Sequence, residues 1–220
     1  MIYKFPNPNL APKNAPACMG GNLSPEMLIS AYKQSYFPWF LENEPILWWT
    51  PDPRCVIFPN EIKVRKSTKP YLKKYEVKFS SNFESLINLC FEVRKKEGLT
   101  WLSQDIVKAY TELANLGIAH SVEVYDDGEL VGGLYGLIFG KMFCGESMVS
   151  IKKEASKVAL IYLCKTLEKY GFLIDSQVTN EHLLFMGARE LERTDFLKLH
   201  KTLINDSLNL DFKNLKPIYN

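Results

Sequence analysis

The sequence lacks the features of a membrane or secreted protein. Its longest apolar run, Leu130 to Gly140, contains four glycines and is far too short to span a bilayer. The first nine residues hold two prolines and no apolar stretch of the kind found in secretory signals. We therefore expect a cytoplasmic protein with no membrane partner.

Metal-binding, disulfide and nucleotide-binding patterns are missing as well. The five cysteines include no Cys-x-x-Cys pair, and the three histidines include no His-x-x-x-His pair. These spacings argue against a disulfide framework and against a metal site. No P-loop, dinucleotide fingerprint, Gly-x-Ser-x-Gly elbow or His-Glu-x-x-His helix occurs. Kinase, dehydrogenase and hydrolase functions therefore have no motif to support them.

The chain does have enough apolar material for a core. Of its 220 residues, 46% are hydrophobic and 24% are charged, with both signs mixed. This composition excludes a disordered or fibrous chain. Because the net charge is only +2, any contact with RNA must come from a local basic patch. The densest basic stretch runs from Lys63 to Lys74.

Two regions of different character follow one another. Residues 1–53 are rich in proline and aromatic residues, and Ser24-Pro25-Glu26 is a helix start with an N-cap and a proline at the first helical position. The prolines at 38, 45, 51 and 53 disfavour regular helix and strand pairing around them. We expect a small N-terminal domain, 1–53, and a larger domain, 54–220.

The larger region alternates strand and helix patterns. Apolar residues at helical spacing predict helices around 83–91, 106–114, 160–167 and 196–204. Strand patterns occupy 55–58, 120–125, 129–139, 142–149 and 172–178, and Asp127-Gly128 predicts a hairpin turn. Consecutive hairpins with flanking helices indicate an α+β fold around a central, mostly antiparallel sheet.

Two sets of polar residues interrupt apolar strands. If Glu146 is buried, its carboxylate must be paired or hydrogen-bonded, and the alternative is a strand-end acid facing solvent. Asp175 and Gln177 are two apart on a strand and are expected on one face, where they can accept a proton from an attacking amine. The alternative for this pair is the polar face of an edge strand.

The four tryptophans, Trp39, Trp48, Trp49 and Trp101, have two interpretations. Aromatic side chains near basic residues can stack on a nucleotide base. They can equally form a core aromatic cluster.

Many short stretches together resemble the leucyl/phenylalanyl-tRNA–protein transferase family, in family order over roughly residues 5–196. They include Gly20-Gly21-Asn22-Leu23-Ser24-Pro25, Phe37-Pro38-Trp39-Phe40, Trp48-Trp49-Thr50-Pro51-Asp52-Pro53-Arg54, Phe143-Cys144-Gly145-Glu146-Ser147-Met148 and Leu173-Ile174-Asp175-Ser176-Gln177. A single motif of this kind is weak evidence for the family, whereas this many motifs in register are strong evidence.

The resemblance implies a GNAT-like acyltransferase domain after the small N-terminal one. It implies transfer of Leu or Phe, and less readily Met, from aminoacyl-tRNA to an N-terminal Arg or Lys. Such a leucyltransferase marks acceptor proteins for N-degron degradation. An ester-linked aminoacyl group is already activated, so positioning the amine and removing one proton is sufficient. No cofactor is expected, and the protein is expected to be a monomer.

The resemblance also implies roles for particular residues. Asp175 and Gln177 match the pair that activates the acceptor amine, and Glu146 matches a residue contacting the acceptor or the aminoacyl-adenosine end. Lys66, Lys69 and Lys73 match the region that grips the tRNA acceptor stem. The remaining substrate-binding candidates are Trp39, Trp101, Tyr32, Tyr110, Leu134, Phe143, Ser147, Met148, Ile174 and Asn180.

Departures from the family pattern and other functions leave alternatives open. Gln34-Ser35-Tyr36 and Phe185-Met186 replace residues usual in the family, which affects substrate preference and tRNA affinity more than reaction type. An aminoacyl-tRNA-dependent peptide-bridge transferase and an acyl-CoA N-acyltransferase are the alternative enzymes, although no Gln/Arg-x-x-Gly-x-Gly/Ala pyrophosphate loop occurs. A tRNA-binding module that has lost its chemistry is the non-enzyme alternative.

Overall fold

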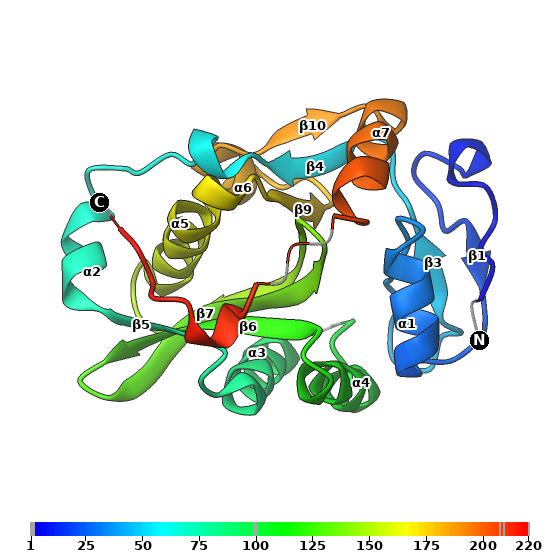
Figure 1. The fold of residues 1–220 in the computed structure, drawn as a ribbon. Helices are drawn as coiled ribbons and strands as arrows, with labels where there is room; N and C mark the ends of the chain where they lie inside the picture. The colour runs from blue at the N-terminus through cyan, green and yellow to red at the C-terminus, as the bar shows by residue number, and fades with distance from the viewer. Residues whose placement is uncertain (1–2, 99–100, 207, 209, 220) are drawn as a thin grey trace.

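The structure is a computed structural model that describes residues 3–98, 101–206, 208 and 210–219. Its strands form two sheets, one of three strands and one of seven (Figure 1). The three-stranded sheet and helix α1 lie at one end of the molecule, beside the larger sheet and its helices. No helix among the described residues has the length and apolar character needed to cross a membrane.

The small sheet has the order β1-β3-β2, with β1 (Cys18–Met19), β2 (Phe37–Pro38) and β3 (Leu47–Trp49) all antiparallel. The prolines nearby predict restricted strand pairing, and the three strands here are only two or three residues long. Pro38 is tolerated because β2 is an edge strand. Helix α1 (Pro25–Tyr32) begins as predicted, with the Ser24 side chain accepting a hydrogen bond from the Met27 amide.

The large sheet has the order β10-β4-β9-β8-β7-β6-β5. Its strands are β4 (Arg54–Ile57), β5 (Glu76–Phe79), β6 (Ala119–Asp126), β7 (Glu129–Phe139), β8 (Met142–Ser150), β9 (Leu173–Gln177) and β10 (Arg189–Leu191). Among the pairings of these strands, only β8–β9 is parallel. The predicted α+β class with a mostly antiparallel sheet is confirmed, and so is the hairpin turn at Asp127-Gly128.

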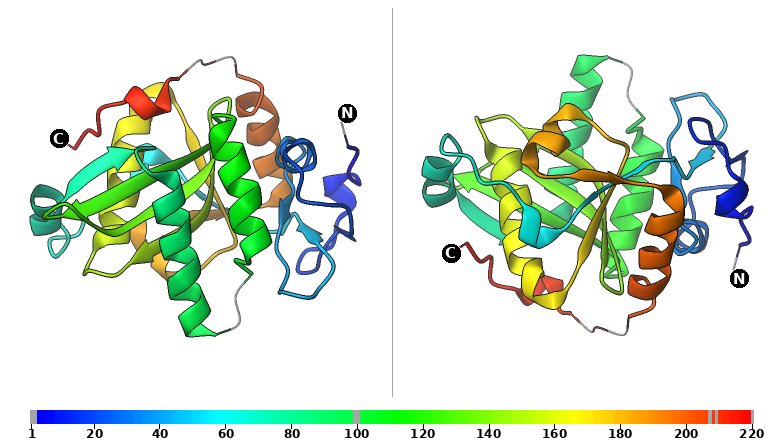
Figure 2. Two further views of the ribbon diagram at one scale, coloured as in Figure 1. Left: turned by 90° about the horizontal axis from the view of Figure 1, so that it is seen from below. Right: turned by 90° about the horizontal axis from the view of Figure 1, so that it is seen from above.

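Helices cover both faces of the large sheet (Figure 2). Helices α3 (Phe83–Glu97) and α4 (Gln104–Asn115) lie on one face, and α5 (Ala155–Leu167) lies on the other. The remaining helices are α2 (Lys69–Lys74), α6 (Glu181–Met186), α7 (Arg193–Leu203) and the short 3-10 turns η1 (Pro8–Leu10), η2 (Pro59–Glu61), η3 (Glu168–Tyr170) and η4 (Phe212–Asn214). The four predicted helices correspond to α3, α4, α5 and α7.

The two sheets share a hydrophobic core. Leu28, Tyr32 and Trp48 belong to the same buried cluster as residues of α3, α4 and β7. The buried Arg193 at the start of α7 adds polar links, donating to the carbonyls of Ala11, Pro12 and Thr50. The change of sheet between Trp49 and Arg54 lies close to the expected boundary at residue 53, and the division into two domains stays a prediction.

Candidate functional site

The large sheet opens in its middle. The parallel strands β8 and β9 are paired only from Met142↔Leu173 to Cys144↔Asp175. Beyond that point β8 continues beside β7 and β9 continues beside β4, so the two strands no longer bond to each other. The opening lies between Gly145–Met148 and Ser176–Gln177.

A β-bulge lies on each side of this opening. Tyr135 pairs with Ser147 and Gly136 pairs with Gly145, which leaves Glu146 as the extra residue of β8. Across the opening, Cys55 pairs with Gln177 and Val56 with Asp175, which leaves Ser176 as the extra residue of β9. A bulge redirects side chains away from the regular alternation of a strand. Gln177 accordingly has a φ of 55°.

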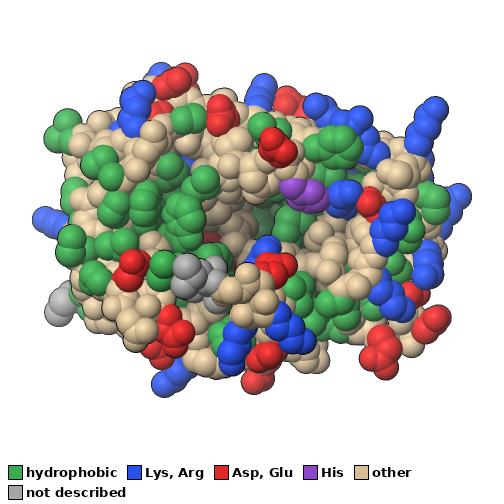
Figure 3. Space-filling model, turned by 180° about the vertical axis from the view of Figure 1, so that it is seen from behind, with side chains coloured by type: hydrophobic (Ala, Val, Ile, Leu, Met, Phe, Trp, Pro, Cys, Tyr) green, Lys and Arg blue, Asp and Glu red, His purple; other side chains and the backbone are tan. Residues whose placement is uncertain are grey.

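Two adjoining cavities, of about 370 and 270 Å³, occupy the opening. Both are lined by Trp101, Glu146, Ser176, Gln177 and Asn180. The larger cavity has an apolar wall formed by Leu134, Phe143, Met148, Leu160, Leu163 and Ile174. The smaller one is bounded by Phe37 and Pro38 of β2 and by Trp39, which follows this strand. Figure 3 shows a face of the molecule that is hollowed near its centre, with hydrophobic side chains inside the hollow.

Glu146 lies where the cavities meet and accepts hydrogen bonds from neutral groups. The Tyr32 hydroxyl donates to its Oε1 at 2.7 Å, the Tyr110 hydroxyl to its Oε2 at 3.1 Å, and Gln177 Nε2 to its Oε1 at 3.2 Å. Burial raises the pKa of Glu146 to about 7, against the lowering effect of the two tyrosine hydrogen bonds. Glu146 is half-buried in the middle of β8 and has three hydrogen-bond donors, so the alternative of a strand-end acid facing solvent is wrong.

Tyr32, Tyr110 and Glu146 form a hydrogen-bonded cluster whose number of protons depends on the ionisation of Glu146. The two tyrosine hydroxyls lie 2.5 Å apart, so Tyr32, Tyr110 and the Glu146 carboxyl form a ring of three oxygen–oxygen contacts. Burial raises the pKa of both tyrosines well above the usual value, so each keeps its proton. An ionised Glu146 leaves two protons for three contacts, and a protonated Glu146 supplies the third. One proton added to Glu146 therefore completes the hydrogen bonding of the ring.

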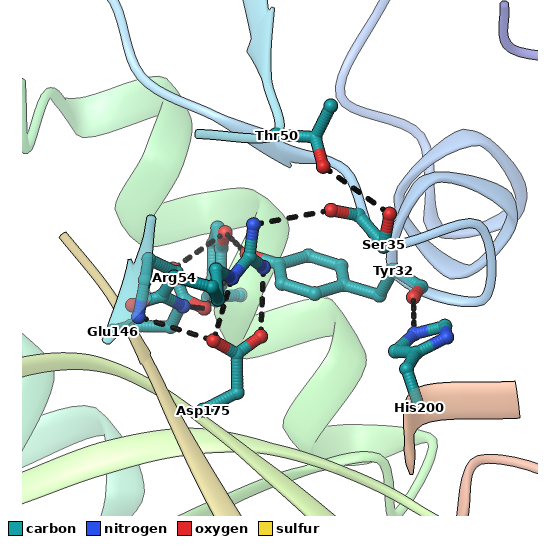
Figure 4. Close-up of polar contacts among 9 residues, drawn as sticks. Tyr32, Ser35, Thr50, Arg54, Glu146, Asp175 and His200 are labelled. Atoms are coloured by element: carbon teal, nitrogen blue, oxygen red, sulfur yellow. Dashed lines mark hydrogen bonds and ion pairs between the residues drawn. The ribbon is translucent and has the colours of Figure 1, made fainter. Parts of the chain in front are cut away.

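Asp175 has a different environment. Arg54 binds it through two hydrogen bonds, Nε to Oδ1 at 2.8 Å and Nη2 to Oδ2 at 2.7 Å, and both side chains are almost fully buried (Figure 4). The Arg54 guanidinium also lies over the rings of Phe37 and Phe196. Asp175 Oδ1 accepts the backbone amide of Gln177 at 3.1 Å. The carboxylate therefore holds the bulge rather than lining either cavity.

Most predicted site residues meet at these cavities. The larger one is lined by Trp101, Leu134, Phe143, Glu146, Ser147, Met148, Ile174, Gln177 and Asn180. Trp39 lines the smaller one, while the buried Tyr32 and Tyr110 reach the site through Glu146. Asp175 stands behind Gln177, because the bulge at Ser176 breaks the alternation expected of that strand.

The predicted tRNA-binding lysines lie apart from the cavities. Lys69 and Lys73 are one helical turn apart on α2, Lys66 lies just before this helix, and all three are exposed. Sequence reasoning missed Arg54 and the α5 wall residues Leu160 and Leu163. Arg54 had a signal, since an arginine opening the apolar strand Cys55-Val56-Ile57 requires a buried partner. The described residues contain no group of three or more His, Cys, Asp or Glu placed to hold a metal ion.

A carboxylate shared by two adjoining cavities suits a transferase, which must bring donor and acceptor together at one point. Residues 56–201 match the family model "Leucyl/phenylalanyl-tRNA protein transferase", and residues 21–52 match the model of that family's N-terminal domain. The chain therefore belongs to the leucyl/phenylalanyl-tRNA–protein transferase family and is an aminoacyltransferase.

Individual relatives agree with the family models. The chain is 45% identical over 208 residues to a leucyl/phenylalanyl-tRNA–protein transferase of Campylobacter jejuni, covering 94% of each chain. It is 52% identical over 183 residues to one of Nitrosomonas eutropha, covering 82% of this chain and 78% of the relative. An aminoglycoside acetyltransferase from a soil metagenome has a TM-score of 0.39 at 11% identity, covering 66% of this chain and 98% of that one. That likeness is too weak to carry an argument.

Proposed function

We propose that this protein transfers Leu or Phe, and less readily Met, from aminoacyl-tRNA to the N-terminal Arg or Lys of acceptor proteins. The observation that carries the proposal is the position of Glu146 and Gln177 at the junction of two cavities. The apolar wall of the larger cavity suits an apolar amino-acid side chain, and the unbranched Met148 lets it accept more than one shape. Trp39 and Trp101, beside the smaller cavity, suit the terminal adenosine.

We propose a direct attack of the acceptor amine on the ester carbonyl of the aminoacyl group. The C–N amide bond forms, the C–O ester bond breaks, and the terminal ribose of the tRNA leaves as its hydroxyl. Glu146 takes the proton that the amine loses, which completes the hydrogen-bond ring with Tyr32 and Tyr110. It then gives this proton to the ribose oxygen as the C–O bond breaks, so that Glu146 ends the reaction ionised. A base whose pKa is about 7 is well matched to this step near neutral pH.

Asp175 has a positioning role in this scheme. Its carboxylate is occupied by Arg54 and by the Gln177 amide, which fixes the backbone from which the Gln177 side chain reaches Glu146. The expectation from the family, that Asp175 and Gln177 act together on the amine, stays a prediction. The arrangement around Arg54 favours Gln177 as the member that meets the substrate.

Further proposals follow from the family. Residues 54–220 are proposed to form a GNAT-like domain, supported by the one parallel pair that parts within a mostly antiparallel sheet. The N-terminal domain over 1–53, a cytoplasmic location and a monomeric state are proposed with it. Marking of acceptors for N-degron degradation is proposed as the consequence of the transfer.

The function is tested by transfer of labelled leucine from Leu-tRNA to a peptide beginning with Arg, beside the same peptide beginning with Ala. Label is expected on the Arg peptide alone, with free leucine inert. No transfer from Leu-, Phe- or Met-tRNA by folded protein would favour a tRNA-binding module. Transfer to a different acceptor amine would favour a peptide-bridge transferase.

The tRNA contact is tested separately at Lys66, Lys69 and Lys73. Replacing all three by Ala is expected to flatten the dependence of log K on log salt by about two to three, because each phosphate contact releases about one counterion. Replacing Lys33, Lys78 and Lys198, which are also exposed, removes the same charge elsewhere. Equal salt dependence of tRNA binding in the two triple variants would contradict the assignment of Lys66, Lys69 and Lys73 to tRNA binding.

A further inference from the structure

The C-terminal segment 210–219 lies beyond residues 56–201, the part of the chain that matches the transferase family model. It crosses the same face of the large sheet as α5, and Figure 1 shows it running between β6 and α2. One polar contact lies just before the segment and another lies near its C-terminal end. Lys141 pairs with Asp206 at 2.9 Å before the segment, and the Ile218 amide donates to the buried Thr166 hydroxyl at 3.0 Å.

Phe212 anchors this segment in the core. It is 1% exposed, and its ring stacks on Phe79 at 4.9 Å between centroids and on Phe143 at 6.3 Å. His120 packs against it at 4.8 Å. Of these neighbours, Phe143 is also part of the apolar wall of the larger cavity. Phe212 thus stands behind a residue that faces the cavity.

On another side, the Phe143 ring packs against the backbone of Gly136. A Cβ atom added at Gly136 would lie 2.6 Å from Cε1 and 2.8 Å from Cζ of Phe143, so the ring occupies the space that any other residue at 136 would fill. With Gly136 on one side and Phe212 on another, the ring has little room to move. Interiors packed in this way transmit small changes to neighbouring side chains.

We propose that Phe212 is a positioning residue that sets the size of the amino-acid pocket through Phe143. The proposal rests on the proposed function, in which the larger cavity holds the side chain of Leu, Phe or Met. Shortening residue 212 leaves a void behind Phe143, into which that ring can retreat. The enlarged pocket favours the larger Phe side chain over Leu.

The test compares kcat/KM for Phe-tRNA and Leu-tRNA in the full-length protein with Phe212→Ala. The Phe/Leu ratio is expected to rise about tenfold, near the lower end of what one methylene changes in an apolar pocket. The KM for the Arg peptide is expected to stay unchanged. Phe212→Leu, which refills most of the void, is expected to restore most of the original ratio and serves also if Phe212→Ala fails to fold.

Tyr219→Ala is the matched control, because Tyr219 lies in the same segment but packs on Tyr162 of α5. It is expected to lower stability without changing the Phe/Leu ratio. An unchanged ratio in both Phe212 variants, or the same change in Tyr219→Ala, would overturn the proposal. If the wild-type chain transfers neither amino acid, the proposed function fails instead. Titration of the wild type and the variants with leucyl- and phenylalanyl-adenosine then tests the pocket directly.

Discussion

Two carboxylates on adjacent strands, Glu146 of β8 and Asp175 of β9, lie in contrasting surroundings. Asp175 is buried against a permanently charged guanidinium that satisfies both of its oxygens. Glu146 is surrounded by two hydroxyls and an amide, none of which carries a charge. Both oxygens of Asp175 are occupied by its charged partner, whereas burial outweighs the neutral donors of Glu146 and raises the pKa of its carboxyl to about 7. The two carboxylates thus differ in position: Asp175 is held in an ion pair behind the site, and Glu146, the proposed base, lines both cavities.

The largest effect expected from this comparison is on chemistry. Glu146→Gln keeps the size and hydrogen-bonding reach of the side chain but cannot take a proton. We expect single-turnover transfer of leucine to fall by about 10²–10⁴-fold, the usual contribution of a general base. Binding of Leu-tRNA is expected to change little. Equal losses in rate and binding would assign Glu146 to binding alone.

The second expected effect is on folding. Arg54→Met leaves the Asp175 carboxylate buried without its partner, and we expect the free energy of unfolding to fall by about 3–5 kcal/mol. Urea unfolding at neutral pH measures it. The double variant Arg54→Met/Asp175→Leu is expected to recover most of this stability while transfer stays low, because the Gln177 amide has lost its acceptor. A double variant with full activity would show that the ion pair has no positioning role.

A third expected effect connects Glu146 to stability. Its pKa in the folded protein is raised from 4.5 to about 7 by burial. The native state therefore binds more protons than the unfolded chain between these values, and wild-type stability falls as pH rises from about 4.5 to about 7. Glu146→Gln lacks this loss and is expected to be more stable than the wild type by about 1–3 kcal/mol at pH 8. Below pH 4.5 the difference should vanish, and a constant difference across pH would contradict the assignment.

The smallest expected effect is a shift in the pH profile. The hydrogen bond from Tyr110 lowers the pKa of Glu146, so Tyr110→Phe should raise it. A neutral hydrogen bond contributes about 1 kcal/mol, so the rising limb of transfer should move up by about half to one pH unit. Tyr125→Phe is the control, because the Tyr125 hydroxyl forms its hydrogen bond with Ser81. The acceptor amine has the same pKa in assays of both variants. An equal shift of the pH profile in Tyr110→Phe and Tyr125→Phe would therefore show that Glu146 does not cause the shift.

Local patterns predicted much of the fold. The helix start at Ser24, the hairpin at Asp127-Gly128 and strand β7 depend on neighbours in sequence, and each lies where it was predicted. The parting of β8 and β9 was not predictable in this way, because it depends on which strands lie beside each other. Strand β8 stays beside β7, its neighbour in the sequence, whereas β9 stays beside β4, which comes from a distant part of the chain.

The site was predicted in composition more than in geometry. The family resemblance named the cavity residues, and the sequence suggested that a buried Glu146 needs donors. It could not identify Arg54 as the partner of Asp175, since the two are 121 residues apart. Gly136 and Gly145, paired beside the bulge at Glu146, were an available signal, because glycine within a strand often marks a bulge.

The core shared by the two sheets also has a consequence for biosynthesis. Tyr32 precedes Tyr110 by 78 residues and Glu146 by 114, and Arg193 follows Ala11 by 182. The aromatic face of α1 and the carbonyls near residues 11, 12 and 50 therefore emerge from the ribosome long before their partners exist. The N-terminal segment cannot make its contacts with Arg193 until helix α7 has been translated. The base proposed for transfer gains the Tyr32 hydroxyl only when the start of the nascent chain has come together with strand β8.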